Sequence, residues 1–282
     1  MRKGAFWIVM AIVASVVAFG SAGCSDKKAT PIDSTATTTD SGVVVADTME
    51  AIISETPMPK TADELFDDFF FNFAANRKLQ FQRIKFPLPV ESYGKMSTLS
   101  KSQWRMDHFF MHQDYYTLIF DNMRQMALVK DTTVSQVVVE KIFLSRNRVK
   151  QYKFNREGGK WMLTSINSRA IAANNNSSFL KFYREFATDS AFQVKSINDP
   201  LKFTGPDPDD EFSTMSGFLA PEQWLSFAPE LPTDVIYNIL YGQKYAESKR
   251  KIFVMRGISN GMETELTFER HGHQWLLMAL SM

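Results

Sequence analysis

Phenylalanine recurs at helical spacing in two separate stretches of the chain. The residues, three or four positions apart within each stretch, are Phe66, Phe69, Phe70 and Phe73, and then Phe179, Phe182 and Phe186. Apolar residues at such intervals lie on one face of a helix. The second stretch follows the first by 113 residues. We therefore predict two equivalent helices, each of which buries an aromatic face.

Further matches extend this repetition towards the C-terminus. They pair Gln80 with Gln193, Ile84 with Ile197, Pro87-Leu88 with Pro200-Leu201, Gln103-Trp104 with Gln223-Trp224, Lys141-Ile142-Phe143 with Lys251-Ile252-Phe253, Phe154 with Phe268, and Trp161 with Trp275. Self-similarity at a fixed interval indicates a duplicated structural unit. The matches predict one copy over residues 60–173 and a second over 174–282, each as long as an ordinary domain.

The same series of elements is expected in each copy after the aromatic helix. Extended segments are expected around Gln80–Phe86 and Phe192–Ile197, followed by a short helix that carries Trp104 or Trp224. Alternating or apolar runs then predict strands over 115–120, 134–145, 148–156 and 160–167, and over 235–241, 249–256, 262–270 and 274–280. A helix followed by an antiparallel sheet makes an α+β unit.

The N-terminus has the plan of a secretory signal over residues 1–23. Two basic residues precede an apolar run over 5–19, which is short for a membrane span. Cys24 is the single cysteine of the sequence, so no internal disulfide can form. Its position directly after Ser21-Ala22-Gly23 resembles the bacterial lipobox, in which the cysteine carries lipid. We predict a lipid anchor on Cys24, with an ordinary signal peptide as the alternative.

Residues 24–59 are rich in Ser, Thr and Asp and contain no aromatic residue. Such a composition buries too little apolar surface to offset the entropy of ordering. We predict a lipidated flexible tether that holds the folded part clear of a membrane. Local packing of Val43-Val44-Val45 and Ala51-Ile52-Ile53 onto the first copy is the alternative. The expected location is the cell envelope, as an outer-membrane lipoprotein facing the periplasm or the cell surface.

Charge differs between the two copies. Residues 60–173 carry 18 Lys and Arg against 11 Asp and Glu, whereas residues 174–282 carry 10 against 14. A basic first copy beside an acidic second copy suggests an anionic partner for the first, or mutual attraction of the two. A secreted protein without a nucleic-acid motif is not expected to bind nucleic acid.

The order of these elements, after a lipobox and a polar tether, is similar to a family of uncharacterised Bacteroidetes lipoproteins with NTF2-like repeats. The resemblance covers residues from about 60 to 282 and is carried by the Phe66/Phe69/Phe73 helix, by Trp104 and Trp224, and by the C-terminal hairpins. It implies two tandem NTF2-like (cystatin-like cone) domains, each a helix packed on a curved antiparallel sheet. It implies no activity, because this fold hosts enzymes and binding modules alike.

The densest group of potentially catalytic residues lies between Trp104 and Tyr116. If residues 104–112 were helical, His108 and His112 would share a face and could chelate a metal with Asp107 or Asp114. Asp107 and a histidine could instead act as a general acid and base. The second copy has no equivalent histidines. We expect surface or half-buried polar residues, with Asp107, His108 and His112 kept as weak catalytic candidates.

Basic residues crowd the late strands of the first copy. They are Lys141, Arg146, Arg148, Lys150, Lys153, Arg156 and Lys160. Such residues could contact a sulfated or uronic-acid glycan, a lipid phosphate or the acidic second copy, although charge on the outer face of a sheet is usually solvated. Arg146, Arg148, Lys150 and Lys153 are the binding candidates.

Two other clusters suggest cation sites weakly. His271-Gly272-His273 falls in an expected hairpin turn, where both histidines face solvent. The acidic stretch over 205–211 could attract calcium, but it lacks the spacing of a calcium-binding loop. We therefore predict no metal and no cofactor.

The sequence favours a non-catalytic envelope lipoprotein that binds an envelope protein, a glycan or a small apolar ligand. The alternatives are a pocket lyase, isomerase or hydrolase that uses Asp107, His108 or His112, and a purely structural component of an envelope complex. Common hydrolase and nucleotide-binding motifs are absent from the sequence.

Overall fold

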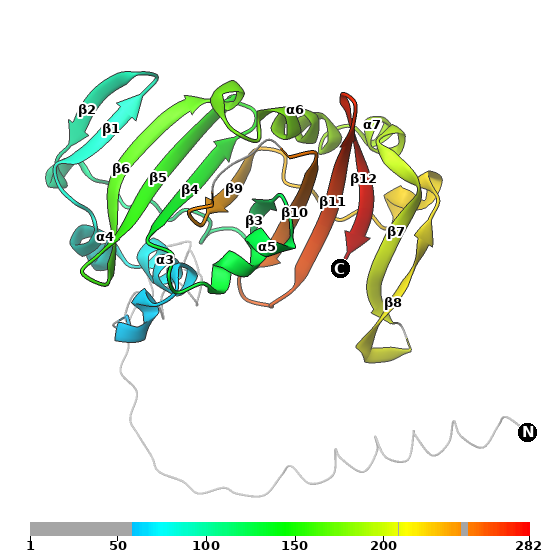
Figure 1. The fold of residues 1–282 in the computed structure, drawn as a ribbon, viewed down its shortest axis with the longest axis horizontal. Helices are drawn as coiled ribbons and strands as arrows, with labels where there is room; N and C mark the ends of the chain where they lie inside the picture. The colour runs from blue at the N-terminus through cyan, green and yellow to red at the C-terminus, as the bar shows by residue number, and fades with distance from the viewer. Residues whose placement is uncertain (1–57, 208, 244–247) are drawn as a thin grey trace, which may run out of the picture. The chain divides into compact units, whose positions relative to one another are not determined.

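The computed structural model describes residues 58–207, 209–243 and 248–282. The predicted signal, Cys24 and the tether up to residue 57 lie outside this range. Within it, no helix is long and apolar enough to cross a membrane. The described chain is a mixture of short helices and two six-stranded sheets (Figure 1).

The two halves of the chain contain similar series of helices and strands. The first half (60–173) contains, in order, η1 Lys60–Asp63, α3 Phe66–Ala75, α4 Arg77–Arg83, β1 Leu88–Ser92, β2 Lys95–Leu99, η2 Lys101–Gln103, β3 Tyr115–Phe120, α5 Met123–Ala127, η3 Leu128–Lys130, β4 Gln136–Phe143, β5 Arg148–Glu157, β6 Lys160–Ala170 and η4 Ile171–Ala173. The second half (174–282) contains α6 Ser177–Phe186, α7 Ser190–Lys195, β7 Ile197–Asp207, β8 Asp210–Leu219, η5 Pro221–Ser226, β9 Val235–Leu240, β10 Arg250–Gly257, β11 Glu263–His271 and β12 Gln274–Ser281.

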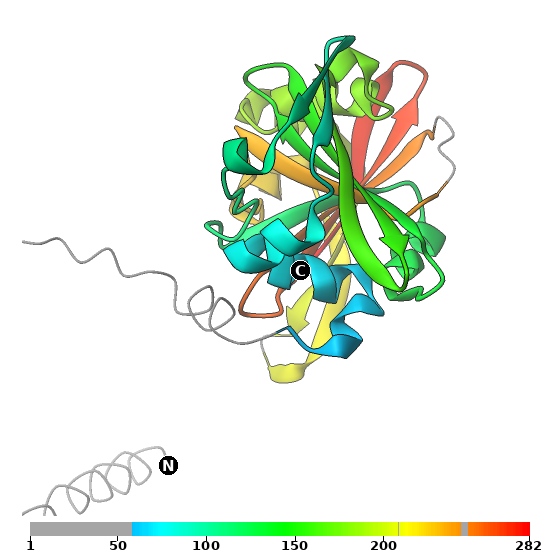
Figure 2. The same cartoon turned by 90° about the vertical axis from the view of Figure 1, so that its left-hand side faces the viewer.

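Each sheet takes one strand from the other half of the chain. The first sheet has the order β2-β1-β6-β5-β4-β9, and the second has the order β3-β10-β11-β12-β7-β8. Strand β9 thus pairs with β4, and β3 pairs with β10, both antiparallel. The strands fan out in Figure 2, as expected for strongly twisted sheets. The two halves are therefore joined by a reciprocal exchange of one strand.

The aromatic helices are confirmed in both halves. In α3, the rings of Phe69 and Phe73 lie 5.9 and 5.3 Å from that of Phe154 on β5. In α6, the rings of Phe182 and Phe186 lie 5.6 and 5.3 Å from that of Phe268 on β11. Burying each such ring contributes about 1.5–3 kcal/mol relative to leaving it exposed. Equivalent helices therefore anchor equivalent sheets.

The extended segments expected at Gln80–Phe86 and Phe192–Ile197 were wrong. The chain forms the short helices α4 and α7 there, because a side chain caps each helix start. The Asn76 side chain accepts a hydrogen bond from the Leu79 N–H, and the Asp189 side chain accepts from the N–H groups of Ala191 and Phe192. These two caps were the missed signals.

The match between Lys141-Ile142-Phe143 and Lys251-Ile252-Phe253 was also wrong by four positions. In the first sheet Val137 lies opposite Phe154, and in the second sheet Lys251 lies opposite Phe268. Since Phe154 and Phe268 are equivalent, Lys251 corresponds to Val137, and Lys141 corresponds to Met255. Apolar strands offer several similar alignments, and only the pairing of neighbours selects one.

Candidate functional site

A glutamine in α4 positions the segment that carries the predicted catalytic residues. The Gln80 amide donates to the backbone oxygens of Phe73 (2.9 Å) and Asp107 (2.8 Å). Its own oxygen accepts from the Trp104 indole N–H at 3.1 Å. Gln80 is fully buried, so these bonds satisfy a polar group that would otherwise be costly inside the core. The segment after Trp104 is thereby fixed against α3 and α4.

The Asp107 carboxylate points at two lysines and a tyrosine. Its oxygens lie 3.3 Å from Lys141 Nζ and 3.9 Å from Lys150 Nζ, and it accepts hydrogen bonds from the Tyr152 hydroxyl and the Phe109 N–H. Burial acts to raise the pKa of Asp107, but Lys141, the two hydrogen bonds and Lys150 outweigh burial and hold the pKa below its ordinary value. The partners of Asp107 therefore favour its ionised form.

Burial and neighbouring charges also shift the pKa values of the groups around Asp107. Burial lowers the pKa of Lys150, and the charges of Lys141 and Arg148 act in the same direction, against the opposing effect of Asp107. Burial and the Asp107 charge both raise the pKa of Tyr152 and of Tyr237. The two tyrosines therefore keep their hydroxyl protons, and the lysines are held close together at an energetic cost.

Positive charge continues towards the connection between β4 and β5, where it surrounds one aromatic ring. The charged groups of Lys141, Arg146 and Arg148 lie 5.9, 5.8 and 4.5 Å from the ring centre of Phe143. Lys150 lies directly opposite Lys141 in the strand register. We call these five residues the Phe143 patch.

The Phe143 patch has more positive charge than its neighbours neutralise. Asp107 is the carboxylate that pairs with its lysines. Among the described residues, neither Arg146 nor Arg148 forms an ion pair, and the Arg148 Nε atom is buried without a hydrogen-bond partner. A buried donor without an acceptor costs about 1–3 kcal/mol. An anion placed at the patch would supply the missing acceptor.

His108 and His112 do not lie on a helix, so the premise of the metal-chelating pair was wrong. Phe109 has φ 51°, a left-handed conformation that interrupts any helix over 104–112. The two imidazole rings nevertheless lie 4.5 Å apart, with His112 exposed and His108 half-buried. The Asp107 carboxylate contacts Lys141, Lys150, the Tyr152 hydroxyl and a backbone N–H. Within the described residues, no three potential ligands come together at a metal-binding distance.

The remaining basic candidates lie apart from the Phe143 patch. Lys153 is on the opposite face of the first sheet, because side chains alternate along β5. The Arg156 guanidinium lies 5.9 Å from the ring centre of Trp161 and donates to the Thr132 carbonyl at 2.7 Å. Lys160 is exposed at the start of β6. The structure thus brings Asp107, Arg146, Arg148 and Lys150 together and separates Lys153 from them.

The second half has an apolar counterpart of this site. Trp104 and Trp224 are equivalent at an interval of 120 residues, which places Phe227 where the first half has Asp107. The strand registers place Met255, Thr264 and Leu266 at the positions of Lys141, Lys150 and Tyr152. The Phe227 ring packs on Phe203, with 5.3 Å between ring centres. The charged site therefore belongs to the first half alone.

The two weak cation candidates of the second half are ordinary turns. His271 and His273 are exposed on either side of Gly272, whose φ of 62° suits a tight hairpin. In the acidic stretch, the Asp207 carboxylate accepts a bond of 2.9 Å from the Asp209 N–H within the β7–β8 hairpin. These contacts stabilise the turns themselves.

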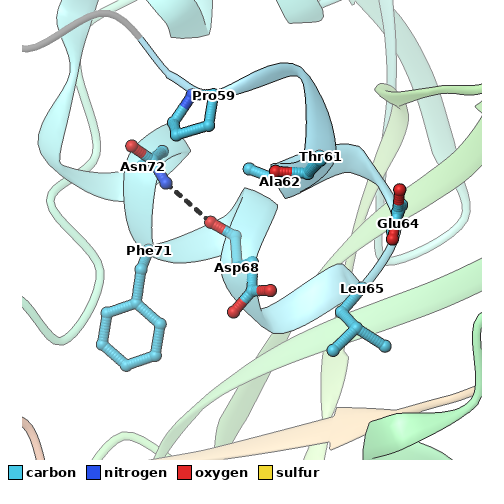
Figure 3. A pocket seen from close by; sticks show the side chains of 8 residues that line it. All are labelled: Pro59, Thr61, Ala62, Glu64, Leu65, Asp68, Phe71 and Asn72. Atoms are coloured by element: carbon cyan, nitrogen blue, oxygen red, sulfur yellow. Dashed lines mark hydrogen bonds between the residues drawn. The ribbon is translucent and has the colours of Figure 1, made fainter.

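A hollow of about 440 Å³ beside the start of α3 has few directed polar groups. Figure 3 shows its lining, in which the Asn72 side chain donates to the Asp68 carbonyl of the same helix at 2.8 Å. Phe71 and Leu65 also line it. The arrangement has no cluster comparable to that around Asp107, so we do not assign a site to this hollow.

Comparison with known proteins places the chain in a family. The model of a domain of unknown function, DUF4348, matches residues 45–282. The chain belongs to the DUF4348 family. A solved NTF2-like protein from Bacteroides fragilis is 44% identical, with a TM-score of 0.73, over 80% of this chain and 98% of that one. No curated protein matches. The resemblance to a family of unknown function with an NTF2-like member is therefore confirmed.

Proposed function

We propose that this DUF4348 protein is a non-catalytic binding protein that takes an anionic ligand at the Phe143 patch. The observation that carries the proposal is the Arg148 guanidinium, which combines a buried unpartnered Nε with a position over the Phe143 ring. A guanidinium presents several donors in one plane and therefore suits carboxylate, sulfate or phosphate groups. Lys150, whose pKa is lowered by burial and by neighbouring cations, would be stabilised by the same ligand.

The state of Asp107 favours binding over catalysis. A general base works best with a pKa near the operating pH, whereas the pKa of Asp107 is lowered by its partners. Its oxygens already accept from Tyr152 and from Phe109 N–H and lie beside two lysines. In this proposal Asp107 holds the lysines in place and competes with the ligand for them.

We further propose that the chain is a tandem pair of NTF2-like units that have exchanged one strand. The parallel series of elements, the two aromatic helices and the equivalent tryptophans support this interpretation. One unit has a charged site and the other has an apolar one, so the two units would bind different ligands. The lipid anchor on Cys24 and the outer-membrane location complete the proposal, and both are supported by the sequence pattern alone.

Titration with citrate, followed by NMR or calorimetry, tests the proposed function. We expect binding that weakens as salt rises, because salt screens charge pairs. The Arg148→Gln variant should bind at least about tenfold more weakly, as expected when a charge-assisted hydrogen bond is lost. Lys160→Gln removes an exposed cation of the same half and should leave the affinity unchanged. Equal affinity of the parent and a folded Arg148→Gln protein would exclude the patch.

A further inference from the structure

A groove of about 350 Å³ lies on the first sheet, on the face opposite α3. Its lining comes mainly from β5 and β6, with further residues from the β1–β2 hairpin. Figure 1 shows this hairpin at the end of the sheet, beside β6. Its volume falls within the range of small-ligand sites. The Phe143 patch is on the other face, so the two sites are separate.

The floor of the groove presents hydrogen-bond acceptors. The Gln151 amide nitrogen donates to Glu140 at 2.7 Å, and the Asn167 amide nitrogen donates to Glu91 at 3.3 Å. These bonds fix the orientation of both amides, which lie directly opposite each other in the register. Within the described part of the chain, neither amide oxygen accepts a hydrogen bond. The middle of the groove therefore calls for a ligand with donor groups.

Two cations stand at different ends of this floor. Lys153 lies opposite Ser165, and Arg169 is four residues further along β6. At ~3.3 Å per residue, the two positions are roughly 13 Å apart along the strand. Neither cation pairs with a carboxylate among residues 58–207, 209–243 and 248–282. The ends of the groove therefore favour negative charge.

We propose that this groove binds an acidic oligosaccharide. Sugar hydroxyls are donors for the Gln151 and Asn167 oxygens, and carboxylates along the saccharide reach Lys153 and Arg169. A free phosphate or sulfate has acceptor oxygens and would leave the amide oxygens unpaired. An acidic peptide has backbone N–H donors, but its own side chains would hold them away from side chains that project from a sheet face. The rim supplies apolar contact through Met96, which is 71% exposed.

The second sheet supplies an internal comparison. Both sheets have a bulge at the same place, between Lys153 and Phe154 in one and between Thr267 and Phe268 in the other. This equivalence puts Glu265 at the position of Gln151 and Thr267 at the position of Lys153. A carboxylate in place of the Gln151 amide, and a threonine in place of the Lys153 cation, would make these positions of the second sheet less favourable to the same ligand. The groove is therefore expected to be specific to the first sheet.

Binding of galacturonic-acid oligomers to the full chain tests the proposal, with neutral maltohexaose and a glutamate oligopeptide as comparisons. We expect the acidic saccharide to bind more tightly than both. Lys153→Gln and Arg169→Gln should each weaken it by at least about threefold, the scale of an exposed charge pair. Asn167→Ala should weaken saccharide binding without changing peptide binding. Lys160→Gln should have no effect.

Several results would overturn the groove assignment. They are the absence of saccharide binding, tighter binding of the glutamate peptide, and an equal loss in Lys160→Gln, which would indicate non-specific attraction. Unchanged affinity in folded Lys153→Gln and Arg169→Gln proteins would do the same. The Arg148→Gln variant separates this proposal from the proposed function, because it should lose citrate binding and keep saccharide binding.

Discussion

The Thr117 hydroxyl of β3 donates to the Tyr237 carbonyl of β9 at 2.7 Å and accepts from the Tyr237 N–H at the same distance. One side chain thus satisfies both backbone groups of a residue 120 positions away. It does so where the two exchanged strands lie beside each other, and both residues are almost fully buried. The Thr117 hydroxyl therefore helps to join the two sheets, together with the Asn238 side chain of β9, which accepts from the Ile119 N–H of β3 at 2.9 Å.

Replacing this hydroxyl should weaken the whole described fold. In Thr117→Val the Tyr237 N–H and carbonyl would both lose a partner inside the core, at a cost of about 1–3 kcal/mol for each unsatisfied group. Urea unfolding followed by circular dichroism measures the loss. Thr98→Val, at an exposed position of β2, is the matched control and should change stability little. A loss no greater than that of the control would contradict this role of Thr117.

Two equivalent glutamines should have different effects when replaced. Gln193 bonds the Phe186 carbonyl and the Trp224 indole at 2.8 Å each, as Gln80 bonds Phe73 and Trp104. Gln193→Leu should therefore lower stability by about 1–3 kcal/mol and leave citrate affinity intact. Gln80→Leu should lower stability similarly and also raise citrate affinity, because Gln80 holds the Asp107 backbone and its loss would release the carboxylate that competes with the ligand. Identical citrate affinity in both variants would show that the Asp107 segment does not position the patch.

Asp67 should make the protein less stable as pH rises from 4 to 7. Burial raises its pKa from 3.8 to about 6, against a hydrogen bond from the Tyr241 hydroxyl. A raised folded-state pKa contributes stability below pH 3.8, and this contribution is lost as pH rises through 6. Asp67→Asn should remove up to about 3 kcal/mol of this dependence. Melting temperatures at pH 4 and 7 measure it.

The neighbouring Asp68 is exposed on the same helix and supplies the control. Asp68→Asn should keep most of the pH dependence of the parent protein, because the Asp68 charge is the smallest of the four influences on the Asp67 pKa. If Asp67→Asn melts no higher than the parent at pH 7, the assigned environment of Asp67 is incorrect.

Asp107 should have opposite effects on stability and on ligand affinity. Asp107→Asn removes the carboxylate that holds Lys141 and Lys150, so stability at pH 7 should fall by about 1–3 kcal/mol. Because the folded-state pKa of Asp107 is lowered, its contribution is present above pH 3.8 and is lost as pH falls through the folded value. Citrate affinity should rise, since the competing carboxylate is gone. A fall in affinity together with a fall in stability would show that Asp107 helps to build the patch.

The aromatic framework could be predicted from the sequence, but the strand exchange could not. The spacing of the phenylalanines around Phe69 and Phe182 predicts the two helices, because apolar residues on a buried helical face recur every three or four positions. Strands β3 and β9 are both buried apolar runs. The sequence of such a run does not determine which strand it pairs with. The exchange depends on long-range pairing, which local patterns do not encode.

Only part of the candidate site could be predicted from the sequence, because the site also depends on long-range contacts. Asp107 and Lys150 were singled out separately, and Lys141 was known only as one of seven basic residues. Their convergence depends on the turn at Phe109 and on the β4–β5 register. Alternation along β5 could have separated Lys153 from Lys150, since an odd number of positions places them on opposite faces.

Because the two halves that exchange a strand belong to one chain, dilution cannot separate them. Two independent subunits dissociate when their concentration falls below the dissociation constant, whereas linked partners keep a fixed effective concentration. Both binding faces would therefore stay in a constant ratio at any protein concentration. The duplicated chain therefore behaves as a dimer whose assembly is complete once the chain has folded.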